Sequence, residues 1–161
     1  MLPFEDKVLS IHNYDCHNSI LLLTEAGIYV RGTNKYGQLG VLGEYINEFT
    51  KIPFDFGNIV YVTNSFCATI VVSTTGIYGF GCYFRFEDSI KPEGDDFRCL
   101  PTKLKIKNNI RYLYASDESF VLGFEEDNKI VYYYMHNDSG IMTLQHDENH
   151  PHYITPSKIE I

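Results

Sequence analysis

A glycine-bounded hairpin sequence occurs twice in this chain. Thr24-Glu-Ala-Gly-Ile-Tyr-Val-Arg-Gly32 returns 49 residues later as Ser73-Thr-Thr-Gly-Ile-Tyr-Gly-Phe-Gly81. Units repeated at a fixed period of this length bury their apolar faces by stacking on one another. The period therefore predicts a repeat protein before any local pattern is considered.

The repeat can be followed through the 161 residues as one repeat domain of three units. Their approximate bounds are 8–56, 57–107 and 108–161. The third unit is degenerate, but its end, Pro156-Ser-Lys-Ile-Glu-Ile, echoes Pro101-Thr-Lys-Leu-Lys-Ile at the end of the second. Met1-Leu-Pro-Phe has the form of Lys51-Ile-Pro-Phe, so we expect the chain to begin with a strand that would finish a preceding unit.

Each unit contains about four strand-like runs. Short apolar runs are followed at once by a glycine-containing turn and a second run, which is the pattern of a β-hairpin. We expect hairpins at 19–32, 68–81 and about 119–134, within an all-β chain of three four-stranded antiparallel blades. Six apolar residues are expected to share equivalent buried positions: Ile20, Leu22, Ile70, Val72, Phe120 and Leu122.

Six glycines are expected to be turn or close-approach positions, because only glycine takes positive φ without steric cost. They are Gly27, Gly32, Gly37, Gly40, Gly76 and Gly81. A phosphate-binding loop would need a helix after it. The residues that follow Gly40 are Val-Leu-Gly-Glu-Tyr-Ile, which show neither an apolar stripe at helical spacing nor a cap signal.

The stretch from Leu23 to Gly40 resembles the repeat of the regulator of chromosome condensation family, in which an L-T-x-x-G hairpin runs into G-x-N-x-x-G-Q-L-G. The second unit keeps the hairpin but has Cys82-Tyr-Phe-Arg-Phe-Glu in place of the rest, and the third keeps only spacing and strand character. The resemblance implies β-propeller blades. Because propellers close with roughly four to eight blades, three units imply a partial, open propeller.

Composition and charge restrict the class of protein further. The formal net charge is −8 and the isoelectric point is near 5.1, which disfavours direct binding of nucleic acid. The sequence has no apolar run long enough to span a membrane and no signal-peptide pattern. Four cysteines without Cys-x-x-Cys spacing are expected to be free thiols, so we expect an intracellular protein, cytoplasmic or nuclear.

Two groups of residues have the chemistry of a reactive site. His136, His146, His150 and His152 have ligand-type spacing, but they lie in sequence of loop composition, so no metal is expected. The acidic groups at Glu93 and Glu125 are explained as charged turns. No nucleophile-elbow phrase is present, so we expect neither an enzyme nor a cofactor.

The sequence is therefore interpreted as a non-enzymatic protein–protein interaction module that uses blade-edge loops or open end faces. The longest expected loops are 43–50, 82–99 and 137–152. The middle loop contains the expected contact residues Tyr83, Phe84, Arg85, Phe86, Glu87 and Asp88, although aromatic packing beneath the loop would also explain them.

Two alternative functions remain open at this stage. The resemblance implies guanine-nucleotide exchange on a Ran-type small GTPase, by differential binding of the nucleotide-free form. A structural subunit of a larger assembly is the other alternative. In every case an open arc leaves blade faces that we expect to be covered by a protein partner or by self-association.

Overall fold

The computed structural model describes most of the first two units and the strands of the third. The described residues are 6–14, 18–65, 67–81, 100–104, 110–115, 119–126, 129–136, 144–147 and 157–158. All regular secondary structure within them is β-strand, arranged in three antiparallel sheets. The expected all-β fold of stacked antiparallel sheets is confirmed.

The first two sheets have four strands each, in the order of the sequence. The first consists of β1 (Val8–Tyr14), β2 (Ser19–Thr24), β3 (Gly27–Thr33) and β4 (Tyr45–Lys51). The second consists of β5 (Ile59–Asn64), β6 (Ala68–Ser73), β7 (Gly76–Gly81) and β8 (Thr102–Lys103). The β2–β3 and β6–β7 hairpins lie where the sequence predicts them.

The third sheet contains the predicted β10–β11 hairpin and has a fifth strand. Its strands are β9 (Ile110–Ala115), β10 (Ser119–Glu126), β11 (Lys129–His136), β12 (Leu144–Asp147) and β13 (Ser157–Lys158). The last strand, β13, pairs with β9 at the opposite edge from β12. The expectation that the end of the third unit matches the end of the second is therefore wrong, because β12 takes the place that β8 has in the second sheet.

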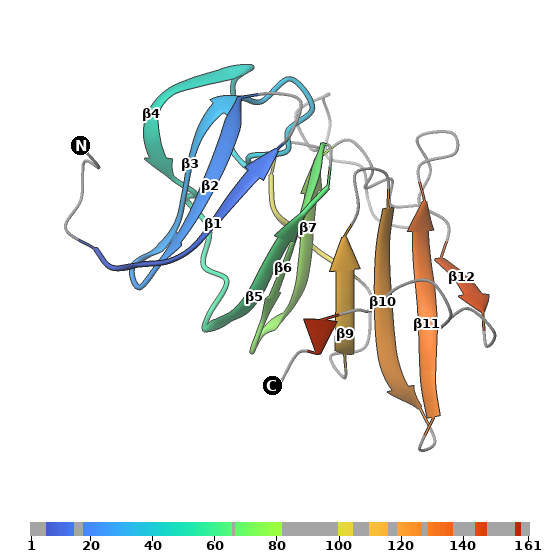
Figure 1. Ribbon diagram of the computed structural model, residues 1–161. Coiled ribbons are helices and arrows are strands. Elements are labelled where there is room, and N and C mark those ends of the chain that lie inside the picture. Colours follow the sequence, from blue (N-terminus) through green and yellow to red (C-terminus); the bar gives the residue numbers. More distant parts are fainter. Residues whose placement is uncertain are drawn as a thin grey trace.

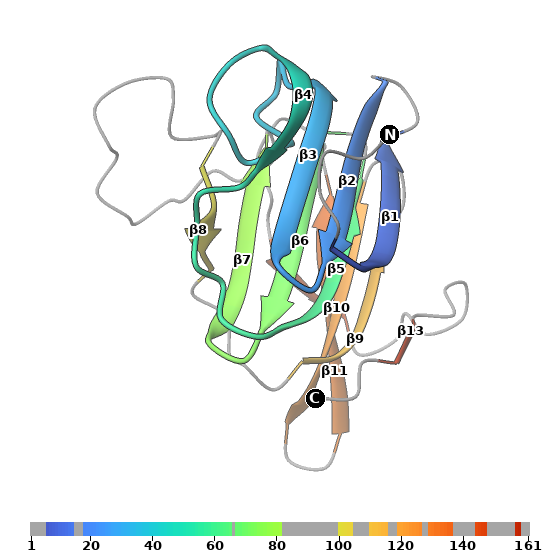
Figure 2. The same ribbon diagram turned by 90° about the vertical axis from the view of Figure 1, so that its left-hand side faces the viewer.

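The three sheets stand side by side like the blades of a fan (Figure 1). Their first strands are neighbours, since β1 contacts β5 and β5 contacts β9. Figure 2, a quarter turn away, shows the first sheet in front of the other two. Because the later strands of each sheet lie further from the line of first strands, the arrangement is an open arc of propeller blades.

One β-bulge recurs in the first strand of every sheet. It leaves one extra residue in each of β1, β5 and β9, because the pairing skips one position there. The skipped residues are Leu9, Val60 and Arg111. The shared bulge fixes which residues of the three sheets are equivalent, and it makes Ile11, Val62 and Leu113 one such set.

The expected equivalence of six buried apolar residues is wrong by one position in the second unit. Leu22, Val71 and Leu122 are equivalent to one another. They pair with Ile11, Val62 and Leu113, the three residues that the bulge makes equivalent. Ile70 and Val72 point to the opposite face of β6. Every residue of β6 is buried, so its apolar pattern gives no signal of which face each residue takes.

Two apolar cores lie between the sheets. One joins the first two sheets and contains residues from both, such as Leu21, Val30, Val62 and Phe80. The other joins the second and third sheets through residues such as Ile70 and Leu122. Each sheet is therefore held by side chains of its neighbour, as stacking of repeat units requires.

Candidate interaction site

The expected contact loop cannot be placed. Tyr83 to Asp88 lie outside the described residues, as does the whole of 82–99. The expected loop at 43–50 is mostly strand, since β4 begins at Tyr45, and the expected loop at 137–152 contains β12. The described surfaces that could form an interaction site are therefore the sheets and the connections of the first unit.

The six glycines singled out in the sequence all have positive φ. Two of them end the second strand of a hairpin with the same φ of 113°, Gly32 in the first sheet and Gly81 in the second. A Cβ atom on Gly32 would lie 2.1 Å from the carbonyl oxygen of Asn18, and one on Gly81 would lie 2.2 Å from that of Cys67. Both positions need glycine for backbone approach as well as for φ.

The Gly-Gln-Leu-Gly connection of the first unit is organised by one buried amide. Asn34 donates from Nδ2 to the carbonyls of Val41 (2.6 Å) and Gly43 (2.8 Å), and its Oδ1 accepts from the backbone N–H of Leu39 (2.8 Å). The Leu39 side chain is fully buried in the core between the first two sheets. This connection therefore packs between the sheets and forms no phosphate cradle.

A hydroxyl cluster links the first two sheets beside this connection. Tyr14 and Thr69 are hydrogen-bonded to each other, and both hydroxyls reach the carbonyl oxygen of Gln38, at 3.1 and 2.8 Å. Burial raises the pKa of the Tyr14 hydroxyl far above its ordinary value. The cluster was not predicted from the sequence, because Tyr14 and Thr69 are 55 positions apart and share no local pattern.

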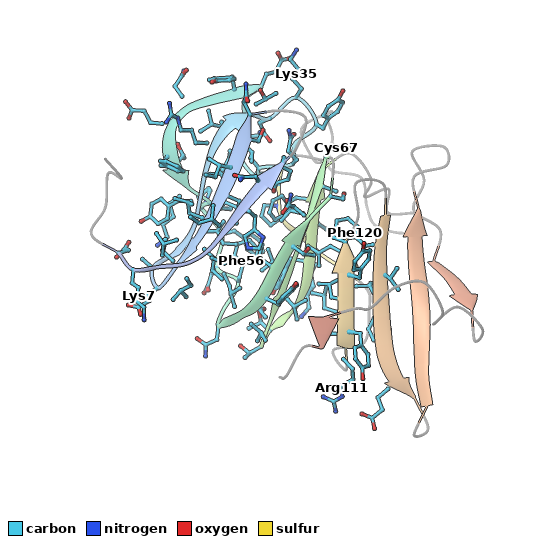
Figure 3. The ribbon with its side chains drawn as sticks, viewed as in Figure 1. Lys7, Lys35, Phe56, Cys67, Arg111 and Phe120 are labelled. Carbon is cyan, nitrogen blue, oxygen red and sulfur yellow. The ribbon has the colours of Figure 1, made fainter. Side chains whose placement is uncertain are left out.

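Each sheet has two faces. We call the face that carries Ile11, Val62 or Leu113 the front face and the opposite one the back face. The front face carries Ile11 in the first sheet, Val62 in the second and Leu113 in the third. Val62 contributes to the core with the first sheet, and Leu113 contributes to the core with the second. Two of the three front faces are thus packed against the back face of the preceding sheet. Figure 3 shows Phe56 in the core between the first and second sheets and Phe120 in the core between the second and third.

None of the described strands lies in front of the front face of the first sheet (Figure 1). The exposed fraction of Ile11 is 62%, against 2% for Val62 and 1% for Leu113. Tyr29, the equivalent of the buried Tyr78, and Ile20, the equivalent of the buried Thr69, are both partly exposed. Leu22, the equivalent of Val71 and Leu122, is only 2% exposed, so this face of the first sheet is open to water at Ile11 and in part at Ile20 and Tyr29.

Arg31 is a charged residue on this open face. Arg31 is equivalent to Phe80, which is 1% exposed in the core between the first two sheets. The guanidinium Nε donates to the carbonyl of Asn47 at 3.0 Å and the group lies 5.9 Å from the ring centroid of Phe49. Tyr29 on the same face donates to the Asp6 carboxylate at 3.5 Å and pairs with Lys51, so the region near β3 carries charges of both signs.

The back face of the third sheet, at the other end of the arc, is less exposed at its described apolar residue Val121. Val121 of the third sheet points away from the second sheet, because its neighbours Phe120 and Leu122 lie in the shared core. Its exposed fraction is nevertheless 3%. At Val121 the outer face of the third sheet is therefore closed to water, whereas the outer face of the first sheet is open at Ile11.

Several other expectations bear on chemistry. Cys67 is in a disulfide, so the expectation of free thiols is wrong for this residue, and cysteine usage gives no support for a reducing compartment. Within the described ranges, no three His, Cys, Asp or Glu side chains gather as metal ligands would. No helix suited to crossing a membrane occurs in the part of the chain that the structure describes.

Comparison with known proteins gives a match in structure alone. No family model and no curated protein matches the sequence. The crystal structure of human WBSCR16 superposes with a TM-score of 0.60 at 18% identity, over 86% of this chain and 37% of that one. Prp20p from Saccharomyces cerevisiae, solved with a study of its binding to Gsp1p and histones, gives 0.60 at 15% identity, over 84% of this chain and 32% of that one.

This chain thus spans about a third of the length of these two solved structures. At such identities the likeness concerns the fold. Both structures are β-propellers of the regulator of chromosome condensation type, and the three sheets here have the same antiparallel blade form. The chain has the fold of a regulator of chromosome condensation type β-propeller, as an open arc of three sheets.

Proposed function

We propose that this chain is a non-enzymatic protein–protein interaction module, and that it binds its partner through the open front face of the first sheet. The observation that carries the proposal is the exposure of Ile11, whose equivalents Val62 and Leu113 are buried in the cores. Apolar surface left in water is unfavourable by about 25 cal/mol for each Å². Exposed apolar patches of this kind mark interaction sites.

The two internal interfaces define the partner's shape. In both of them a front face packs against the back face of another four-stranded sheet. We therefore expect the partner polypeptide to present a propeller-type sheet whose apolar side covers Ile11 and Ile20. Arg31 stands where the second sheet has Phe80, so we expect an acidic or carbonyl oxygen opposite the guanidinium.

Head-to-tail binding of a second copy is less favoured. It would need an open back face on the third sheet, and there Val121 is only 3% exposed. The proposal therefore commits to a different polypeptide, and self-association is one outcome of its test.

Exchange on a Ran-type GTPase is the second candidate. The supporting observation is the fold shared with Prp20p, whose structure is described together with its binding to Gsp1p. No exposed residue in the described part of this chain can be assigned to exchange, so the interaction module is preferred.

Photo-crosslinking tests the proposal. A benzophenone amino acid is placed at Ile11 and, as a matched control on another exposed surface, at Leu42, which is 57% exposed in the connection before β4. We expect an adduct from position 11 that mass spectrometry places within a strand of a β-sheet protein. Equal labelling at both positions, or adducts only between copies of this chain, would contradict the proposal.

A further inference from the structure

The interface between the first two sheets contains a hydrogen bond that joins their first strands. Asn64, the last residue of β5, donates from Nδ2 to the main-chain carbonyl of Asn13 in β1 at 2.9 Å. Asn64 lies on the front face of the second sheet, two residues beyond Val62. The bond thus ties a front-face amide to the first strand of the preceding sheet, at one position along the two strands.

Asn13 is the equivalent of Asn64 in the first sheet. Asn13 pairs with Ile20 and Asn64 pairs with Thr69, and these two partners occupy equivalent positions. The Asn13 side chain is exposed, and within the described ranges its amide makes no hydrogen bond. The first sheet therefore has the same amide on its front face, without the carbonyl that Asn64 finds.

The fold of the described chain does not account for an amide at position 13. Asparagine is depleted in β-strands, so formation of β1 does not favour it. The third sheet has Ala115 at the equivalent position, paired with Phe120, and still packs against the second sheet. Stacking of two sheets therefore does not require an amide there, and the amide of Asn13 is available to a group outside the chain.

Other front-face positions of the first sheet also have the residue types of an internal face. Four equivalent pairs in the first and second sheets are alike: Ile11 and Val62, Asn13 and Asn64, Leu22 and Val71, and Tyr29 and Tyr78. In the second sheet the three non-amide members belong to the core with the first sheet. The front face of the first sheet therefore has the pattern of a face that packs against another sheet.

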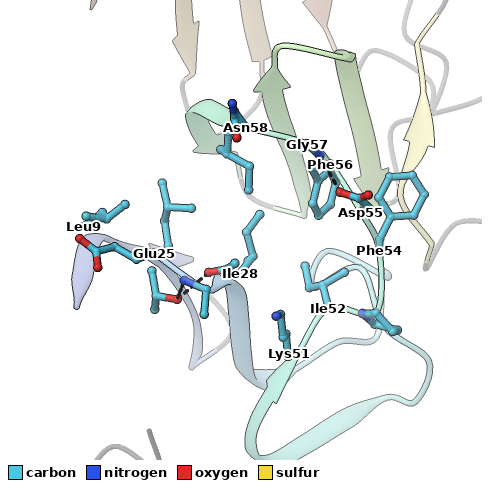
Figure 4. Close-up of a pocket in the computed structure, with 16 residues that line it drawn as sticks. Leu9, Glu25, Ile28, Lys51, Ile52, Phe54, Asp55, Phe56, Gly57 and Asn58 are labelled. Carbon is cyan, nitrogen blue, oxygen red and sulfur yellow. Dashed lines mark hydrogen bonds between the residues drawn. The ribbon is translucent and has the colours of Figure 1, made fainter. Parts of the chain in front are cut away.

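One contact of the internal interface has a substitute in the first sheet. Phe56, which Figure 4 shows on the segment that leads from β4 to β5, has its ring centroid 5.4 Å from that of Tyr78. At the equivalent Tyr29, the hydroxyl donates to Asp6 of the same chain at 3.5 Å. The more open part of the front face therefore lies toward the end of β1, where Asn13 is.

We propose that Asn13 selects the sheet that covers the front face, by donating from Nδ2 to a main-chain carbonyl in the first strand of the partner's blade. This inference rests on the proposed function. The interface already present supports it, because the equivalent amide of Asn64 makes this bond there. A sheet without a carbonyl at that place would leave the covered amide unpaired, which disfavours its binding.

The test measures affinity for the partner polypeptide that crosslinking at position 11 captures, purified and used as the probe. Asn13→Ala should raise its Kd by about three- to tenfold, the effect of one hydrogen bond. Asn13→Asp keeps the size of the side chain but has no N–H, so it should raise the Kd at least as much. Asn58→Ala removes another exposed asparagine side chain, on the β4–β5 segment, and should bind as the unaltered chain does.

The thermal midpoints of these variants should match that of the unaltered chain, because the Asn13 side chain is exposed and the carbonyl that Asn64 uses remains. NMR of side-chain amides gives a second readout. Hydrogen exchange at Asn13 Nδ2 should slow when the probe binds, whereas exchange at Asn58 Nδ2 should not change.

The possible failures are distinguishable. If crosslinking at position 11 captures no partner polypeptide, the proposed function fails and this inference falls with it. If the probe binds but Asn13→Ala or Asn13→Asp binds as tightly as the unaltered chain, only the role given to Asn13 is wrong. An equal loss in Asn58→Ala, or unchanged hydrogen exchange at Asn13 in the complex, would also overturn it.

Discussion

The hydroxyl groups of Tyr14 and Thr69 meet between the first two sheets, in hydrogen-bond contact with each other and with the carbonyl of Gln38. We expect Tyr14→Phe to lower the free energy of unfolding by about 1 kcal/mol, because a buried hydrogen bond is lost while the ring remains. Tyr45→Phe, at a 55% exposed position, should change it by less than about 0.5 kcal/mol. Urea unfolding measures both.

A double-mutant cycle identifies the partner of the Tyr14 hydroxyl. If Tyr14 and Thr69 act as a pair, the effects of Tyr14→Phe and Thr69→Val should not add, and the coupling should be at least about 0.5 kcal/mol. Additive effects would show that each hydroxyl acts only through Gln38.

Asn34 makes three hydrogen bonds to the backbone of its connection and is 2% exposed. Asn34→Ala should therefore destabilise the chain by about 2–4 kcal/mol, since it leaves buried carbonyls and an N–H without partners. Asn47→Ala, with an exposed side chain, is the control. Equal midpoints in urea for the two variants would refute the role given to Asn34.

Gly32→Ala tests the close approach of backbones at the end of the hairpin. The added Cβ would lie 2.1 Å from the Asn18 carbonyl oxygen, at a φ of 113°. A loss of at least about 2 kcal/mol is expected from strain and displaced backbone together. Gly43→Ala has a similar φ of 103° but its nearest neighbour would be 3.7 Å away, so it should lose only the conformational part, about 1 kcal/mol.

The free energy of unfolding should decrease as the pH is lowered, because His12 is harder to protonate in the folded chain than in the unfolded chain. Burial lowers the pKa of His12 below its ordinary 6.5, and its Nε2 lies 2.9 Å from Ser10 Oγ. The unfolded chain therefore binds the proton more readily than the folded one, so the stabilisation is present above about pH 6.5 and is lost as pH falls below it. The free energy of unfolding should decrease between about pH 6.5 and 5.5, and His12→Asn should have a flatter profile in that window. Identical profiles would contradict this assignment.

The hairpins could be predicted because a hairpin is formed by two runs and a turn that are adjacent in the sequence. The turn glycines and apolar runs of the first two units place β2, β3, β6 and β7 within a residue or so. The stacking of the sheets followed from the period. These features depend on neighbours in sequence, which a single chain reveals directly.

The features that were missed depend on contacts across sheets. The recurrent bulge shifts the facing of each first strand by one residue, and no residue type marks it: the skipped positions are Leu9, Val60 and Arg111. Pairing of β13 with β9 likewise joins segments distant in sequence.

We expect a partner to cover the front face of the first sheet when the protein is assembled. Thiol labelling of Ile11→Cys tests it most directly, with Val62→Cys as the control and peptide mass spectrometry to report each position separately. In the purified chain position 11 should react quickly and position 62 slowly, as their exposed fractions of 62% and 2% require. In the assembly isolated from cells, labelling at position 11 should slow by at least tenfold. Labelling at position 11 as fast in the assembly as in the purified chain would contradict it.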